Sequence, residues 1–151
     1  MEELNNAMMK QYPIKDMTEK AFVFPKDPEV MLKQLLFLLH TLIKKGYTLS
    51  VICPHDFILR DKVLFLKKDD HLVSLDTPFV KRKYDKCFVP DLVRDEPLSN
   101  TYASVALFAY YLWTRKKKSK LSESDLGKLK GTKVYYFIKN AMEKNPILLY
   151  L

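Results

Sequence analysis

Glycine and cysteine are both scarce in this chain of 151 residues, which contains three glycines and two cysteines. Gly46, Gly127 and Gly131 are too far apart to form a glycine-rich loop of the kind that holds nucleotide phosphates. Cys53 and Cys87 are too few and too loosely spaced for a disulfide framework or a zinc knuckle. We therefore expect two free thiols in a reducing compartment.

Long hydrophobic segments are also missing. The longest apolar run extends from Val105 to Trp113, far short of the ~20 residues that a membrane-spanning helix needs. The first residues include Glu2 and Glu3 and lack the apolar core of a secretory signal. These absences predict a protein without a transmembrane segment, located in the cytoplasm or within a large assembly.

Positive charge is plentiful, since 26 Lys and Arg residues outnumber 18 Asp and Glu residues and give a formal net charge of +8. A basic surface favours anionic partners. Two runs of cations are the candidate contacts for a polyanion: Lys81, Arg82, Lys83, Arg115, Lys116, Lys117 and Lys118. A solvated lysine-rich surface explains the same runs, so polyanion contact is a secondary prediction and is expected to be weak.

Hydrophobic residues make up 48% of the chain, which is typical of a folded domain with a single sizeable core. We place an N-terminal arm at residues 1–27 and one domain at residues 28–151. Phe22 and Phe24 in the arm predict that it packs against another surface.

Helical spacing of apolar residues predicts the main helices. The expected helices cover residues 28–45, residues 101–114, a short segment after Ser122, and residues 132–144. Asp27 should cap the first helix and Gly46 should end it, while Phe37 widens its apolar face so that the helix is largely buried. Ser99 or Asn100 should cap the second helix, and residues 76–99 should form a loop.

Between the first two helices, the period of the apolar residues changes to that of short strands. The expected strands cover residues 47–51, 57–59, 63–66 and 72–75, separated by charged turns. The fold class is therefore mainly α with a small antiparallel β element, an α+β domain.

The segment Val89-Pro90-Asp91, followed by residues 101–106, resembles part of a protein kinase. Kinases end their activation loop with an Ala-Pro-Glu motif and start the central helix of the large lobe with Asp-x-Tyr/Trp-Ser-x-Gly. The order of the preceding helix and strands is also similar to that lobe. The resemblance covers residues 28–151 and implies a truncated, degenerate C-terminal lobe, a pseudokinase without the small lobe.

The resemblance also implies that the chemistry of a kinase is lost, since phosphoryl transfer needs a phosphate clamp, a metal-holding carboxylate and an oriented nucleophile. Val51 occupies the position of the catalytic base, and Lys67 occupies the position of the metal-binding aspartate. Asp56 stands at the position of a metal-binding asparagine. Thr101 replaces the aspartate that anchors the catalytic loop. We therefore predict no enzyme activity.

Histidine and cysteine offer no short motif for other chemistry. Cys53 and His55 lie two residues apart, but no second pair completes a zinc site and no oxyanion donor supports a hydrolase dyad. His40 and His71 have no paired spacing either. We expect no catalytic residue, no cofactor and no metal.

The predicted function is that of a non-catalytic protein-interaction or assembly module whose partners are other protein subunits, in a homo- or hetero-assembly. One concrete version is a structural, minor-capsid-type subunit of a virus particle. The alternatives are a basic protein that binds nucleic acid or another polyanion, and a residual kinase-related enzyme that needs a partner chain. The predicted partner contacts are Phe22, Phe24, Leu148, Leu149, Tyr150 and Leu151.

Overall fold

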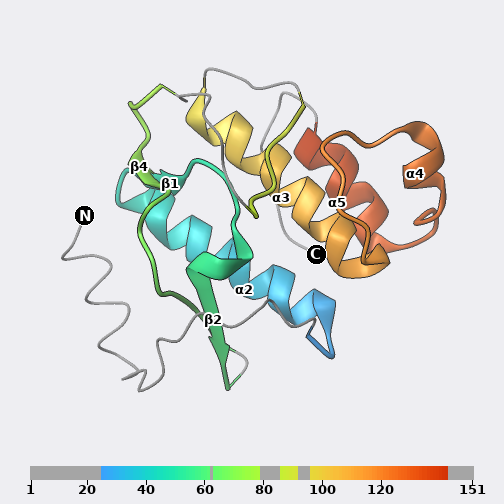
Figure 1. Ribbon diagram of the computed structural model, residues 1–151, viewed down its shortest axis with the longest axis horizontal. Coiled ribbons are helices and arrows are strands. Elements are labelled where there is room, and N and C mark those ends of the chain that lie inside the picture. The colour runs from blue at the N-terminus through green and yellow to red at the C-terminus, as the bar shows by residue number, and fades with distance from the viewer. Residues whose placement is uncertain (1–24, 62, 79–85, 92–95, 143–151) are drawn as a thin grey trace.

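The structure is a computed structural model, and it describes residues 25–61, 63–78, 86–91 and 96–142 (Figure 1). Its elements, in chain order, are α2 (Pro28–Lys44), β1 (Tyr47–Leu49), the 3-10 turn η1 (Pro54–Asp56), β2 (Phe57–Arg60), β3 (Val63–Leu66), β4 (Leu72–Ser74), α3 (Pro97–Thr114), α4 (Glu123–Gly127) and α5 (Lys133–Met142). Helices joined by small antiparallel sheets are the mixed architecture that the sequence predicts.

Helix α2 begins and ends where its sequence signals indicate. Asp27 Oδ1 accepts hydrogen bonds from the backbone N–H groups of Glu29 (3.0 Å) and Val30 (3.3 Å), and Gly46 follows the helix with φ 87°. The expectation that Phe37 widens the buried face is wrong, because Phe37 is 70% exposed. The buried side of the helix is made by its leucines and Met31 instead.

Two small antiparallel sheets follow α2. Strand β1 pairs with β4, with Leu49 opposite Leu72, and β2 pairs with β3 in a hairpin. The hairpin turns at Asp61, whose φ of 51° is left-handed. The β1–β4 pairing brings the segments after and before these strands together, so that the Ser50 N–H donates to the His71 carbonyl at 2.9 Å.

Helix α3 is the centre of the core. It lies between α2 and α5 in Figure 1, and it contacts both of them. It begins at Pro97 rather than at the predicted residue 101, so Ser99 and Asn100 are helical residues rather than caps, and Glu96 is the N-cap. Proline is well suited to the first position of a helix, because its missing N–H has no partner to lose there.

The last two described helices agree with the expected signals. Ser122 and Asp125 form a reciprocal capping box at the start of α4. Helix α5 buries Val134, Phe137 and Ile138 against α3 and ends, in the described part, at Met142. Residues 143–151 lie outside the described residues, and with them the predicted contacts Leu148, Leu149, Tyr150 and Leu151; Phe22 and Phe24 lie outside as well.

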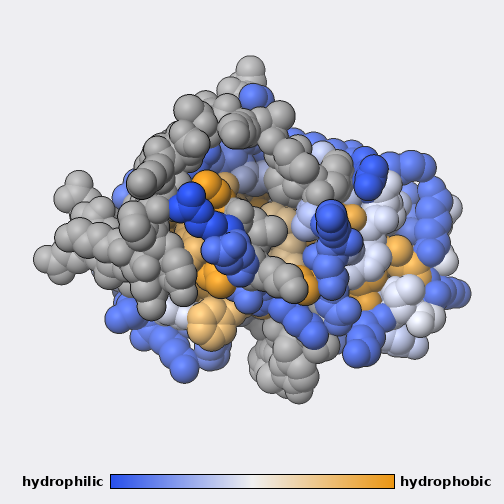
Figure 2. Space-filling view, turned by 90° about the horizontal axis from the view of Figure 1, so that it is seen from below, coloured by the Kyte–Doolittle hydropathy of each residue, from blue (hydrophilic) through white to orange (hydrophobic). Residues whose placement is uncertain are grey.

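Figure 2 shows one face of the molecule, on which several hydrophobic patches lie between hydrophilic side chains. The large hydrophobic side chains most open to solvent among the described residues are Phe37 and Tyr136, at 70% and 64% exposure. No helix in the described ranges combines the length and the apolar character needed to cross a membrane.

Candidate functional site

Polar side chains on the buried side of α3 hold the end of β1 and the loop that follows it. Thr101 Oγ1 donates to the carbonyl of Leu49 at 2.6 Å, and Asn100 Nδ2 donates to the carbonyl of Ser50 at 2.9 Å. These groups are buried, and a buried polar group without a hydrogen bond lowers the stability of the folded state. The loop after β1 is therefore fixed to the central helix by its backbone.

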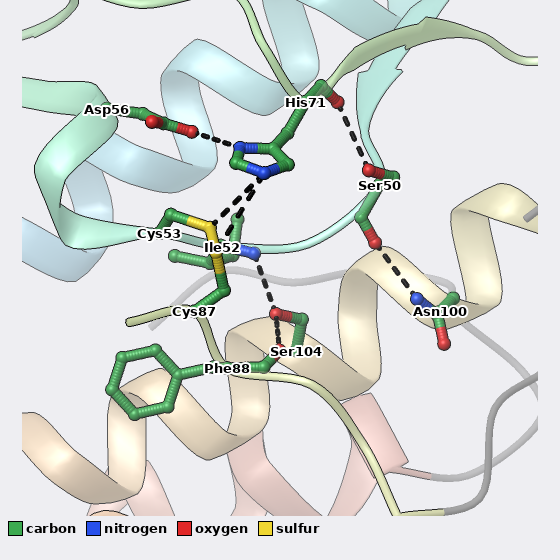
Figure 3. The surroundings of a disulfide bond; sticks show 9 residues. All are labelled: Ser50, Ile52, Cys53, Asp56, His71, Cys87, Phe88, Asn100 and Ser104. Carbon is green, nitrogen blue, oxygen red and sulfur yellow. Dashed lines mark hydrogen bonds and ion pairs between the residues drawn. A yellow bond between two sulfur atoms is a disulfide. The ribbon is translucent and has the colours of Figure 1, made fainter. Parts of the chain in front are cut away.

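Ser104, one turn further along α3, fastens this loop to a second segment (Figure 3). Its Oγ accepts from the Ile52 N–H at 2.8 Å and donates to the Phe88 carbonyl at 2.5 Å. The Phe88 N–H in turn donates to the Ile52 carbonyl at 2.9 Å. One serine thus joins two segments that are far apart in the sequence, and it places Cys53 beside Cys87.

Cys53 and Cys87 form a disulfide, with their Cα atoms 4.1 Å apart and a sequence separation of 34 residues. Both are buried, at 2% and 6% exposure. The expectation of two free thiols is therefore wrong. The spacing of the two cysteines carried no signal, because their proximity comes from the contact between Ile52 and Phe88 and not from a local motif.

A histidine faces this disulfide, and a carboxylate contacts the far side of its ring (Figure 3). His71 Nε2 lies 3.8 Å from Cys53 Sγ and 3.9 Å from Cys87 Sγ, and His71 Nδ1 lies 2.5 Å from Asp56 Oδ2. An ionised carboxylate can only accept, so Nδ1 carries the proton that is donated to Asp56. In the neutral imidazole, this arrangement leaves the lone pair of Nε2 facing the sulfur atoms.

The backbone around η1 holds Asp56 in place. Its carbonyl accepts from the N–H groups of Lys67 at 2.7 Å and Lys68 at 3.2 Å, and its own N–H donates to the Cys53 carbonyl at 2.8 Å. Asp56 and Lys67 are both buried. The carboxylate that orients His71 is therefore part of a rigid frame.

Cys53 and His55, which the sequence analysis considered as a pair and set aside, do not form a site together; the histidine beside Cys53 is His71. Burial lowers the pKa of His55, and the nearby positive charges of Lys86 and Lys67 lower it further. Sequence reasoning missed His71 and Cys87 as members of one site. The long-range pairing of β1 with β4, which the sequence analysis did not predict, places His71 opposite the loop of Ser50 and Cys53.

The cationic run after α3 is partly engaged within the molecule. Lys117 Nζ lies 5.2 Å from the centre of the Phe88 ring, and Lys118 Nζ lies 2.8 Å from Asp125 Oδ1. The hydrogen bond with Lys118 lowers the pKa of Asp125, and Asp125 raises the pKa of Lys118. Of the predicted polyanion contacts, Arg115 and Lys116 are exposed, and Lys81, Arg82 and Lys83 lie outside the described residues.

Comparison with known proteins gives no match, whether with family models, curated proteins or solved structures. The chemistry of the cluster formed by Cys53, Cys87, His71 and Asp56 therefore has to be argued from its own geometry. A buried disulfide has no nucleophilic thiolate to offer a substrate, so in this state the cluster is a structural link between two segments.

Proposed function

We propose that this chain is a non-catalytic protein-interaction or assembly module built on a degenerate kinase-like C-lobe. One observation carries the proposal: none of the three positions that would do kinase chemistry has a carboxylate free to act. Val51, at the position of the base, is fully buried in an apolar cluster with both cysteines. Lys67 is a buried cation at the position of the metal ligand, and Asp56 is bonded to His71.

The order of the elements supports the kinase-like frame. A long helix, a short strand, a turn carrying Asp56, a hairpin and a further strand precede a central helix, which is the order that the resemblance implies. Thr101, at the position of the anchoring aspartate, donates to the carbonyl of Leu49 at the end of β1. A neutral hydroxyl can perform this anchoring task without a buried charge that needs a partner.

The disulfide supports the loss of catalysis. It ties the loop that carries Val51 to the segment of Cys87, which the resemblance equates with the end of the activation loop. In a kinase, these two segments flank the reacting groups. A covalent link between them favours a rigid domain that presents a fixed surface to a partner.

We expect no stabilisation of this protein by magnesium and ATP. A repulsive Lys67 stands where the metal would be held, and a ligand present at 100 times its Kd would add about 2.7 kcal/mol to the free energy of unfolding. Thermal unfolding with millimolar Mg-ATP should therefore give the same midpoint as without it. A raised midpoint that Asp56→Ala abolishes would show that nucleotide binding survives and would overturn the proposal of a non-catalytic protein.

For an assembly module, we expect an exposed hydrophobic side chain to matter for partner contact and not for folding. Phe37 is such a residue, on the outer side of α2, and single anchoring aromatics often contribute 2 kcal/mol or more, roughly, to an interface. Phe37→Glu should leave the melting midpoint within a few degrees of the wild type and remove the partner subunit that co-purifies from the native source.

Lys44→Ala provides the matched control, because Lys44 is an exposed residue at the end of the same helix. It should retain the partner. A Phe37→Glu variant that keeps the complete complex would exclude this face of α2 from the assembly contact, and a chain that is monomeric and alone at native level would contradict the proposed function itself.

A further inference from the structure

We propose that reduction of the Cys53–Cys87 disulfide converts the cluster into a site for one Zn²⁺ ion. The ligands are the two cysteine sulfurs and His71 Nε2, and Asp56 orients the histidine. The donor atoms of these three side chains all lie within 4.8 Å of one another. The inference concerns metal chemistry and does not depend on the kinase-like frame.

The donor set selects the metal. Thiolate and imidazole ligands suit Zn²⁺, whereas Mg²⁺ and Ca²⁺ prefer oxygen ligands. Two cysteines and one histidine are a known three-ligand set for zinc, in which a water molecule completes the tetrahedron. Two thiolates also balance the two positive charges of the ion, so that the ion and its three ligands together carry no net charge in the buried site.

The distances fit a tetrahedral ion. With Zn–S near 2.3 Å and Zn–N near 2.0–2.1 Å, a sulfur and a nitrogen ligand should lie roughly 3.6 Å apart. His71 Nε2 already lies 3.8 Å and 3.9 Å from the two sulfur atoms. The change required is a separation of the sulfurs to about 3.8 Å, which small side-chain rotations of the two cysteines supply.

The supporting contacts of a metal site are already present. A zinc-bound histidine usually donates its other ring N–H to a carboxylate or carbonyl, which fixes the tautomer. His71 Nδ1 makes this contact with Asp56 Oδ2 at 2.5 Å. Asp56 is held by two backbone N–H groups on its own carbonyl, so the orienting carboxylate keeps its place in either redox state.

The cysteines are positioned by contacts that do not depend on the disulfide. Ser104 bonds to the residues next to both cysteines, Ile52 and Phe88, and these two residues also bond to each other through their backbones. Breaking the S–S bond therefore leaves the two sulfurs facing His71. This preformed site lowers the cost of ordering its ligands on metal binding.

The conversion balances with a thiol reductant. Two thiol molecules, or one dithiol, give up two electrons and two protons and become a disulfide, while Cys53 and Cys87 become thiols. Zinc binding then releases these two protons, because both sulfurs coordinate as thiolates. An oxidant that removes two electrons from the thiolates restores the disulfide and releases the ion.

The experiment compares oxidised and reduced full-length chain, with a phosphine as reductant so that no added thiol competes for metal. The phosphine takes its oxygen from water, and the two protons go to the cysteines. Titration with Zn²⁺ in competition with a chelating dye should show one ion bound per reduced chain and none bound by the oxidised chain. Co²⁺ as a probe should give the charge-transfer absorption of thiolate ligands.

Matched variants assign the ligands. His71→Ala and Cys87→Ala should abolish measurable binding, Asp56→Asn should weaken it by about 10–100-fold, and His55→Ala should leave it unchanged. Circular dichroism of each reduced variant checks that it is folded. The proposal can still be tested if an alanine variant fails to fold. Asp56→Asn keeps the shape of the side chain, and the Co²⁺ spectrum is recorded on the wild type.

Three results would overturn the proposal. They are equal binding by the oxidised chain, no thiolate absorption with Co²⁺ in the reduced wild type, and equal losses from His55→Ala and His71→Ala. The last result would place the ion elsewhere on the surface.

Discussion

Ala106→Asp should prevent the chain from folding. Ala106 is fully buried in the middle of α3, among core side chains of α2, α3 and α5. An unpaired charge at such a position costs several kcal/mol, and the added volume costs roughly 1–3 kcal/mol more. The free energy of unfolding of a whole domain is only about 5–15 kcal/mol. Soluble yield and the far-ultraviolet circular dichroism melt are the measurements, and both should show loss of the native state.

Asn140→Asp is the matched control, because it introduces the same carboxylate at an exposed position of α5. An isolated surface substitution of this kind changes stability by roughly 0.5 kcal/mol or less. It should express and melt like the wild type. If Ala106→Asp did so as well, α3 would be a peripheral helix and the core described above would be wrong.

The extent of α2 could be predicted because its signals are local. A capping aspartate, a proline at the first helical position and a glycine after the last turn each act within a few residues. The short strands could be predicted for the same reason, since charged turns separate them. The exposure of Phe37 could not, because it depends on which side of the helix meets the rest of the core.

The start of α3 was misplaced because two residue types were ambiguous. Ser99 and Asn100 are good helix caps, and the sequence offers no means to tell a cap from a polar residue inside a helix. In the structure, the Asn100 side chain donates to the carbonyl of Ser50 instead of capping the helix. The sequence gives no sign of this tertiary contact. The kinase-like frame placed Thr101 at an anchoring position, and its bond to Leu49 agrees with that role, although the frame itself stays a prediction.

The members of the cysteine cluster could not be found by spacing. Cys53 and His71 are 18 residues apart, and Cys53 and Cys87 are 34 residues apart, so no short motif contains them. Their meeting depends on two long-range events, the pairing of β1 with β4 and the contact of Ile52 with Phe88. The kinase resemblance placed Asp56 at the position of a metal-binding asparagine, and in the structure the partner of its carboxylate is His71.

Removing the disulfide should lower the stability of the oxidised protein by about 3–4 kcal/mol. The bond closes a loop of 34 residues, and the loss of its constraint on the unfolded chain corresponds to that range. For a chain of this length, the melting midpoint should fall by roughly 7–14 °C. Cys87→Ala under non-reducing conditions is the variant, and thermal unfolding followed by circular dichroism is the measurement.

Comparison of the single and double cysteine variants separates the contribution of the disulfide bond from that of side-chain packing. Cys53→Ala, Cys87→Ala and the double variant each remove the same covalent link, so their midpoints should agree and the double loss should not be the sum of the single losses. Metal-free wild type in a phosphine reductant should melt close to them. Two results would contradict the prediction: additive losses of stability in the double variant, or a wild-type melting midpoint that does not respond to reductant. Either result would mean that the two sulfurs stabilise the fold only by packing. Packing is the alternative because Cys53 and Cys87 are only 2% and 6% exposed.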